Sequence, residues 1–424
     1  MRPRKKAKLL GCVILFLISY CFTLFLFAYT NEQPIRNAKE ERTLLEEDGA
    51  ELQAIHRSKF RSEFQQQNSL RRFNQSILEI AIDLSAEYLL ARCDNNGKFL
   101  YHESMDSRET LSDNYNVLRH AGTIYSMAMY FQKVRPNSDR TKRLLVRATQ
   151  FLQKQLRPIE LEGTSLKMQA VFSLPNLEVR LKGPKAKLGG TGLGLLAMVL
   201  VEQIVPETTP RSTLKEMGNF LAWMQRNDGS FDSFYFPETG KNDENPSLYY
   251  PGEAAYGLAT LYQLDKDERW LNLALKCLGY LARLRKGEKK VELDHWALLA
   301  TSSVLKNYDK SDRSVLKEDV VAHAGQLTGA IITNLISAPR VNFGTSHVST
   351  LLEGILANAG LFPEAQVGKY RVVIDRSLQY LLDSQVKAGP FKGAIPNKVG
   401  GKRLRIDQNQ HAISAMIEYL ETFR

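Results

Sequence analysis

The sequence is poor in cysteine and has no cysteine pattern typical of a metal site. Only four of its 424 residues are cysteines, and they form no C-x-x-C pair and no zinc-finger spacing. Cys12 and Cys21 fall in one long apolar run, which leaves Cys93 and Cys277 as the pair outside it. One disulfide could join these two, but two unrelated buried thiols are the favoured interpretation.

Basic runs are also lacking outside the first few residues. The net charge is +11, but five basic residues and no acidic one lie in positions 1–8, which leaves +6 (11 − 5) for the rest. No Lys/Arg-rich run of the kind that follows a phosphate backbone occurs there, so nucleic acid is excluded as a partner. The 27 glycines and 15 prolines exclude collagen-like and low-complexity chains, and 43% hydrophobic residues suffice for a sizeable core.

One long hydrophobic run is present near the start of the chain. Residues 9–29 carry no charge, and 21 residues in a helix span about the thickness of a bilayer core. The basic head at 1–8 predicts a cytoplasmic N-terminus, with the body in the periplasm or, in a eukaryote, the Golgi lumen. A cleaved signal peptide is the alternative. Residues 30–72 are predicted to form a stalk, and residues 73–424 a single folded domain.

A repeat organises this domain. From about residue 73, amphipathic helical patterns follow one another with almost no strand signal. Three segments repeat a helix, a glycine turn with an aromatic residue, a loop and a second helix; their turns are at 94–99, 227–231 and 389–393. Glycine provides the left-handed or closely packed backbone that such a helix exit needs.

The repeat predicts an all-α fold of six helical hairpins closed into an (α/α)6 toroid. The outer helices are expected near 74–92, 140–156, 211–226, 268–284, 315–336 and 367–385. The inner helices are expected near 114–132, 189–204, 251–264, 294–306, 346–359 and 407–421. The inner set is richer in small and apolar residues, as helices surrounded by other helices should be. A superhelical solenoid of the same hairpins is the structural alternative.

Polar residues gather where the inner helices begin. Four of the seven histidines lie at equivalent positions there, and a fifth hairpin has Glu253. Taken singly, each histidine is a capping or core residue, and an aspartate at a helix start is an N-cap. Because a ring brings these starts together, we expect them to line one central funnel. The candidates are Asp113, Tyr115, Arg119, His120, Tyr249, Tyr250, Glu253, Asp294, His295, Trp296, His347, Asp407, Gln410 and His411.

The expected funnel suits an acidic sugar polymer. Six helix N-termini pointing into it make it electropositive, and Arg119, Lys187 and Arg405 lie near those starts. Aromatic residues in the same segments provide surfaces on which sugar rings can stack. We therefore predict an acidic polysaccharide or oligosaccharide as the partner.

Two short motifs carry a resemblance. The segments 225–231 (QRNDGSF) and 250–254 (YPGEA), set in six helical hairpins, resemble the six-hairpin carbohydrate-active enzymes. Within that class, 345–348 (TSHV) and 408–414 (QNQHAIS) are similar to the helical domain of D-glucuronyl C5-epimerases. The resemblance covers about residues 73–424 and implies the toroid fold and action on a glycan.

Three chemistries remain open at the level of sequence. Glycoside hydrolysis needs two carboxyl groups, with Glu253 as the acid and Asp294, Asp113 or Asp407 as its partner. Uronate elimination or epimerisation needs a base (His120, His347 or Tyr250) and a cation (Arg119) that neutralises the carboxylate. Tyr115, Tyr249, His295, Trp296, His347, Gln410 and His411 are then predicted to bind the substrate.

No cofactor is expected, although the four histidines and Glu253 could instead hold zinc. Hydrolysis is the first choice among the chemistries. A non-catalytic glycan-binding or assembly subunit is the alternative from another class.

Overall fold

The computed structural model describes residues 75–109, 111, 114–337 and 344–423. The predicted head, membrane span and stalk, as well as Asp113, lie outside the described residues. Residues from Phe73 onward form one compact unit. The boundaries predicted for the head, anchor and stalk therefore stay predictions.

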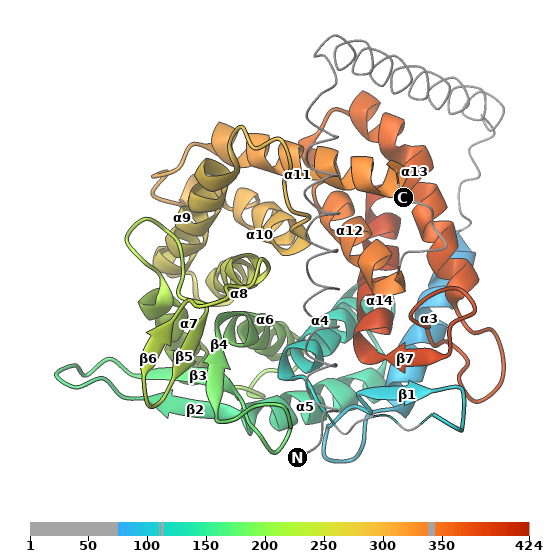
Figure 1. Cartoon of the computed structure of the whole chain (residues 1–424), viewed down its shortest axis with the longest axis horizontal. Coiled ribbons are helices and arrows are strands. Elements are labelled where there is room, and N and C mark those ends of the chain that lie inside the picture. Colours follow the sequence, from blue (N-terminus) through green and yellow to red (C-terminus); the bar gives the residue numbers. More distant parts are fainter. Residues whose placement is uncertain (1–74, 110, 112–113, 338–343, 424) are drawn as a thin grey trace, which may run out of the picture. The chain divides into compact units, whose positions relative to one another are not determined.

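The described chain alternates between outer and inner helices (Figure 1). The outer helices are α3 (Gln75–Ala91), α5 (Asp139–Gln153), α7 (Arg211–Met224), α9 (Glu268–Arg285), α11 (Lys317–Ser337) and α13 (Glu364–Ser384). The inner helices are α4 (Val117–Lys133), α6 (Leu188–Ile204), α8 (Tyr250–Asp265), α10 (His295–Leu305), α12 (Thr345–Ala357) and α14 (Ile406–Phe423). Each of the six predicted hairpins is present, with ends within a few residues of those expected.

The inner helices close into a ring. Each inner helix packs on the next in the order α4, α6, α8, α10, α12, α14, and α14 packs back on α4. This last contact confirms the toroid and makes the solenoid alternative wrong, because a solenoid leaves its first and last hairpins apart.

Glycines bring α6 and α8 unusually close within this ring. A Cβ at Gly192 would lie 2.7 Å from the backbone nitrogen of Ala254, and a Cβ at Gly257 would lie 2.4 Å from the carbonyl oxygen of Gly192. Glycines of the inner helices therefore determine how closely α6 and α8 pack in the ring.

The repeated glycine turns anchor neighbouring outer helices. Gly97, Gly229 and Gly393 have φ values of +84°, +97° and +89°. A Cβ on them would lie 2.0, 2.4 and 1.9 Å from the carbonyl oxygens of Arg147 (α5), Lys276 (α9) and Leu84 (α3), respectively. Only glycine combines a positive φ with so close an approach to another backbone, which explains why the turn recurs.

Short strands are the feature that the sequence prediction missed. A five-stranded antiparallel sheet has the order β2 (Leu156–Ile159), β3 (Met168–Ser173), β4 (Lys185–Lys187), β5 (Phe234–Phe236) and β6 (Gly240–Asn242). A second, two-stranded sheet pairs β1 (His102–Ser104) with β7 (Arg403–Arg405), joining the first loop to the last. The prediction of almost no strand was wrong because segments of three to six residues are too short to show an alternating pattern.

The described residues include two cysteines and one long apolar helix. Cys93 and Cys277 are both free thiols, as the favoured interpretation of the sequence predicted, but only Cys277 is buried and Cys93 is partly exposed. By length and composition, α11 is apolar enough to cross a membrane. It is nevertheless the outer helix of the fifth hairpin, packed against α9, α10, α12 and α13, so its apolar face belongs to the core.

Candidate functional site

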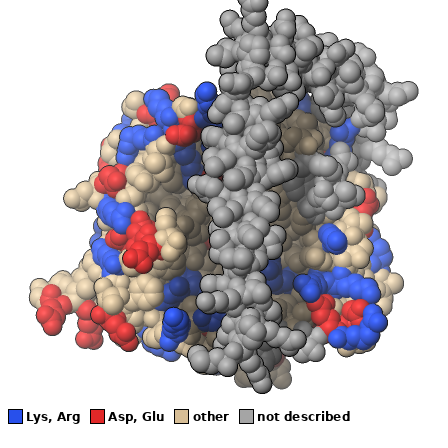
Figure 2. Space-filling model, viewed as in Figure 1, with Lys and Arg blue, Asp and Glu red and all other residues tan. Residues whose placement is uncertain are grey.

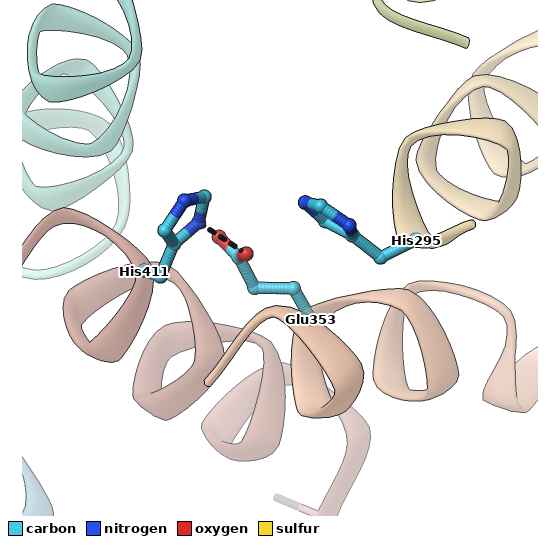
Figure 3. A group of neighbouring side chains, drawn as sticks. All are labelled: His295, Glu353 and His411. Carbon is cyan, nitrogen blue, oxygen red and sulfur yellow. Dashed lines mark hydrogen bonds and ion pairs between the residues drawn. The ribbon is translucent and has the colours of Figure 1, made fainter. Parts of the chain in front are cut away.

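The candidate site is formed by side chains of the inner helices, one of them at a helix start and two further along their helices. Three side chains from three consecutive inner helices meet there: His295 on the first turn of α10, Glu353 on α12 and His411 on α14. One ligand-type atom from each lies within 4.8 Å of the other two, and all three residues are buried. Figure 3 shows the three side chains pointing toward one another. We call this group the His–Glu–His cluster.

Within the cluster, Glu353 fixes the orientation of His411. The Nδ1 atom of His411 lies 2.7 Å from Oε2 of Glu353, while Nε2 lies 3.4 Å from the amide nitrogen of Gln410. In a neutral ring Nδ1–H then donates to the carboxylate, which leaves the lone pair on Nε2. Glu353 therefore fixes both the orientation and the tautomer of the His411 ring.

His295 occupies the opposite side of the cluster and is unsatisfied. Neither of its ring nitrogens has a hydrogen-bond partner in the described structure, although its exposed fraction is only 3%. Burial and the nearby His411 and His347 lower the pKa of His295 well below its usual value, so the ring is neutral. Because an unpaired buried polar group costs about 1–3 kcal/mol, such a group is typical of a place prepared for a ligand.

Aromatic rings surround the cluster. The ring of Trp296 has its centroid 5.0 Å from that of His295 and 6.3 Å from that of His411. Tyr249, 39% exposed, packs edge-on against His295 at 5.2 Å. Tyr125 lies 6.2 Å from Trp296 on its other side. Trp296 and Tyr125 are buried and form the apolar wall behind the cluster, while Tyr249 supplies an exposed ring on which a sugar can rest.

A second polar group contains two arginines on either side of one carboxylate. Arg405 donates two hydrogen bonds to Asp407, at 2.5 and 2.9 Å, and Nε of Arg119 lies 3.2 Å from the same carboxylate. Arg119 also donates to the hydroxyl of Tyr101. Burial would raise the pKa of Asp407, but the two guanidinium groups lower it, so the carboxylate is ionised.

This arginine group carries one excess positive charge next to the cluster. Both arginine side chains are 36% exposed, while Asp407 is buried. Asp407 lies one helical turn before His411 on α14, about 6 Å along the axis. An anionic group on a bound sugar could therefore reach Arg119 or Arg405 while its ring lies at the cluster.

Glu253 is buried in the wall between α6 and α8. Its Oε2 atom has no hydrogen-bond partner in the described structure, and a Cβ at Gly189 would lie 1.8 Å from it. Burial, with a smaller contribution from Asp294, raises the pKa of Glu253 to about 8, and Lys187 opposes the shift. The side chain is thus packed against a neighbouring helix and is protonated at neutral pH.

Asp294 and His120 are occupied in the core. Asp294 caps α10 by accepting from the backbone of Ala297 at 3.0 Å, and Arg285 pairs with its other oxygen at 2.8 Å. His120 accepts from the hydroxyl of Tyr115 at 2.7 Å and donates to the carbonyl of Ala148 on α5 at 2.9 Å. Both residues are fully buried and have their partners within the fold, so we leave them and Tyr115 out of the candidate site.

Of the remaining predicted residues, Gln410 and His347 lie near the cluster, whereas Tyr250 lies beside Glu253. Gln410 is buried beside His411, and its side chain fills the space left by Gly122 on α4. His347 is half-buried, with Nε2 3.2 Å from the side-chain oxygen of Asn334 on α11. Tyr250 packs edge-on against Phe234 at 5.8 Å.

Glu353 is the residue that sequence reasoning missed. Glu353 lies on the third turn of its helix, whereas the predicted site residues lie at helix starts. The surrounding stretch 351–357 is otherwise apolar. The one indication in the sequence is a charged residue within an inner helix that should be apolar. A charged residue is buried in such a helix only when it is paired, which points to a partner.

The cluster also has a donor set suited to a metal ion. Two imidazoles and one carboxylate are ligands that zinc takes in catalytic sites with an open position. Of the four histidines and Glu253 proposed from the sequence, the structure gathers two histidines, with Glu353 in place of Glu253.

Several solved structures share this ring. A D-mannose isomerase is 12% identical, with a TM-score of 0.57 over 84% of this chain and 100% of that one. A cellobiose 2-epimerase from Bacillus thermoamylovorans B4167 is 8% identical, with a TM-score of 0.59 over 81% of this chain and 98% of the other. A GH76 α-1,6-mannanase from Salegentibacter sp. HEL1_6 is 9% identical, with a TM-score of 0.56 over 81% and 99%.

At these identities the likeness establishes the fold alone. No protein-family model matches the sequence, and no curated protein matches it. The chain therefore has the (α/α)6 fold of the six-hairpin carbohydrate-active enzymes, as the sequence motifs predicted.

Proposed function

We propose that this protein is a carbohydrate-active enzyme that binds a sugar unit at the His–Glu–His cluster and transfers a proton on it. The observation that carries the proposal is His295, a buried neutral imidazole with no partner, facing a second imidazole that Glu353 orients. A base with a hydrogen-bond donor close by is what isomerisation, epimerisation or elimination needs at the reacting carbon. Two of the structurally similar proteins are a sugar isomerase and a sugar epimerase, which supports this choice.

The chemistry follows from the different surroundings of the two rings. Nε2 of His411 takes the proton from a carbon next to a carbonyl or carboxyl group, and Glu353 stabilises the imidazolium that forms. The electron pair left by the C–H bond moves onto the adjacent oxygen. The neutral ring of His295 donates an N–H hydrogen bond to that oxygen, and the imidazolium of His411 then gives its proton back to the substrate.

The arginine group supports an acidic substrate. Neutralising the carboxylate of a uronate makes the proton on the adjacent carbon easier to remove, and Arg119 and Arg405 provide partly exposed guanidinium groups one turn from His411. We further propose that the substrate is an acidic polysaccharide or oligosaccharide. Anchoring through residues 9–29, with the body outside the cytoplasm, is part of the same proposal.

Deuterium incorporation tests the proposal. In D2O, the wild-type protein should place carbon-bound deuterium in an acidic oligosaccharide, measured by mass spectrometry and NMR. Glu353→Gln removes the charge behind His411 and should slow the exchange about 10²–10⁴-fold. Glu268→Gln, on the exposed first turn of outer helix α9, is the matched control and should exchange at the wild-type rate.

Hydrolysis is a second candidate because Glu253 is an unpartnered, protonated carboxyl group near the funnel. Of the three partners predicted for it, Asp294 and Asp407 are ion-paired, and Asp113 lies outside the described residues. New reducing ends without deuterium, lost in Glu253→Gln, would replace proton transfer with hydrolysis. Binding without any turnover would instead support the glycan-binding subunit.

Zinc is the cofactor that the donor set allows. Metal analysis of the purified protein distinguishes a cluster that binds zinc from a cluster that transfers a proton. Stoichiometric zinc in the wild type that is absent from Glu353→Gln would assign the cluster to the metal. A wild type that exchanges deuterium at full rate after chelation would leave the proton-transfer role in place.

A further inference from the structure

A cavity is lined by the first repeated turn and the loop that leads to α4. Its volume is about 440 Å³, within the range of small-molecule sites. The residues that matter to the argument are Lys98, Tyr101, His102, Asn114 and Tyr115. We call it the hairpin-1 cavity.

Among the described residues, the hairpin-1 cavity contains a cation that forms no ion pair and a hydrogen-bond acceptor that has no partner. The ammonium group of Lys98 lies over the ring of Tyr115, 5.0 Å from its centroid, and forms no ion pair with any residue that the structure describes. The side-chain oxygen of Asn114 is buried without a partner there. Asp94 also borders the cavity, but its carboxylate accepts from the backbone of Asn96 and Lys98, at 2.8 and 2.9 Å.

Tyr101 joins this cavity to the candidate site. Its ring lines the cavity, and its hydroxyl accepts a hydrogen bond from Arg119, which pairs with Asp407 one turn before His411. The cavity is therefore separated from the arginine group by a single aromatic side chain. Figure 2 shows Lys and Arg atoms, with Asp and Glu atoms among them, on the side of the ring where Figure 1 places β1 and β7.

The same place in the third hairpin has a cavity of different charge. It is about 430 Å³ in volume and is lined by the turn after α7 and the loops before α8 and α10. Its lysine, Lys290, is accompanied by Glu288 and Glu292, while Arg226 and Arg285 are ion-paired with aspartates. Among the charged lining groups that are not ion-paired, this cavity has one excess negative charge, whereas Lys98 and Asp94 balance in the hairpin-1 cavity, so the hairpin-1 cavity repels an anion less.

We propose that the hairpin-1 cavity is a subsite for the next anionic unit of an acidic glycan whose reacting unit lies at the His–Glu–His cluster. Lys98, held over the ring of Tyr115, binds the anionic group, Tyr101 contacts the sugar ring, and Asn114 accepts a hydroxyl hydrogen. The substrate is then a chain of at least two units that extends from the cluster toward the first hairpin. This inference rests on the proposed function for the statement that the reacting unit lies at the cluster. The cavity and its lining residues do not depend on the proposed function.

Binding by oligosaccharides of increasing length tests the subsite. The probes are uronate oligosaccharides of one to six units, titrated into the full-length protein by calorimetry at low and physiological salt. The two-unit probe should bind more tightly than the single unit. Lys98→Ala should weaken it about threefold to fivefold, the effect of one partly exposed ion pair, and salt should reduce the difference. Lys98→Arg should restore the affinity.

Lys290→Ala in the third hairpin is the matched control and should leave every affinity unchanged. Equal affinities for one and two units, or equal effects of Lys98→Ala and Lys290→Ala, would overturn the subsite. If acidic probes bind no better than neutral ones, the anionic assignment is wrong. Deuterium exchange separates this inference from the proposed function. Length-dependent binding without exchange would leave the subsite standing and remove the proton transfer, whereas exchange without length dependence would do the reverse.

Discussion

Glu253→Gln should change how the stability of the protein depends on pH. The wild-type carboxyl group is 5% exposed and unpartnered at Oε2, and burial raises its pKa from 4.5 to about 8. Between about pH 4.5 and pH 8, the folded state keeps this proton while the unfolded state has lost it. The unfolded state binds fewer protons there, so stability falls as pH rises through this window and levels off above pH 8.

The magnitude follows from the same two values. A rise from 4.5 to about 8 corresponds to about 5 kcal/mol of unfolding free energy lost across the window. Glutamine has nearly the same shape and stays neutral, so Glu253→Gln should lose none of this amount. Any cost of the new amide group is independent of pH and shifts the whole curve by a constant.

Denaturant unfolding at half-unit steps from pH 4.5 to 8.5 measures the effect. The curves of the two proteins should run together near pH 5 and separate progressively toward pH 8. Glu268→Gln, at an exposed position, should follow the wild type throughout. Parallel curves for wild type and Glu253→Gln would show that Glu253 is already ionised in the folded protein. That result would also remove it as the acid of a hydrolytic mechanism.

Further predictions concern the repeated turn and a core histidine. Gly229→Ala should lower the unfolding free energy by about 2–4 kcal/mol, because a Cβ there meets a backbone oxygen at 2.4 Å in addition to the positive φ. Gly287→Ala has a similar φ of +79° but open space, and should cost only about 1 kcal/mol; equal losses in denaturant unfolding would contradict the packing argument. Burial lowers the pKa of His120 to about 4, so between pH 6.5 and 4 the unfolded state binds more protons and acid destabilises the fold. His120→Gln should flatten this acid limb of the stability curve while losing about 1–3 kcal/mol at neutral pH, and an unchanged limb would show that other groups cause it.

Much of the fold was predictable because it depends on local pattern. Helix periodicity located all twelve described helices, and the recurring glycine turn indicated hairpins of one kind. The turn recurs because its glycine touches the backbone of another outer helix, so one backbone requirement appears three times in the sequence. The strands were not predictable in this way, since β1 and β7 pair across about 300 residues and each has only three residues.

The candidate site was also predictable only in part. The sequence by itself determined that polar residues stand at the starts of the inner helices, because their position along each helix is a local property. Only the tertiary structure decided which of them share a space. Packing of α12 between α10 and α14 placed Glu353 beside His411 and near His295, while the outer helices engaged His120 and Asp294. A helix start specifies where a side chain begins, but whether that side chain is paired or left open depends on residues that are distant in the chain and adjacent only in the fold.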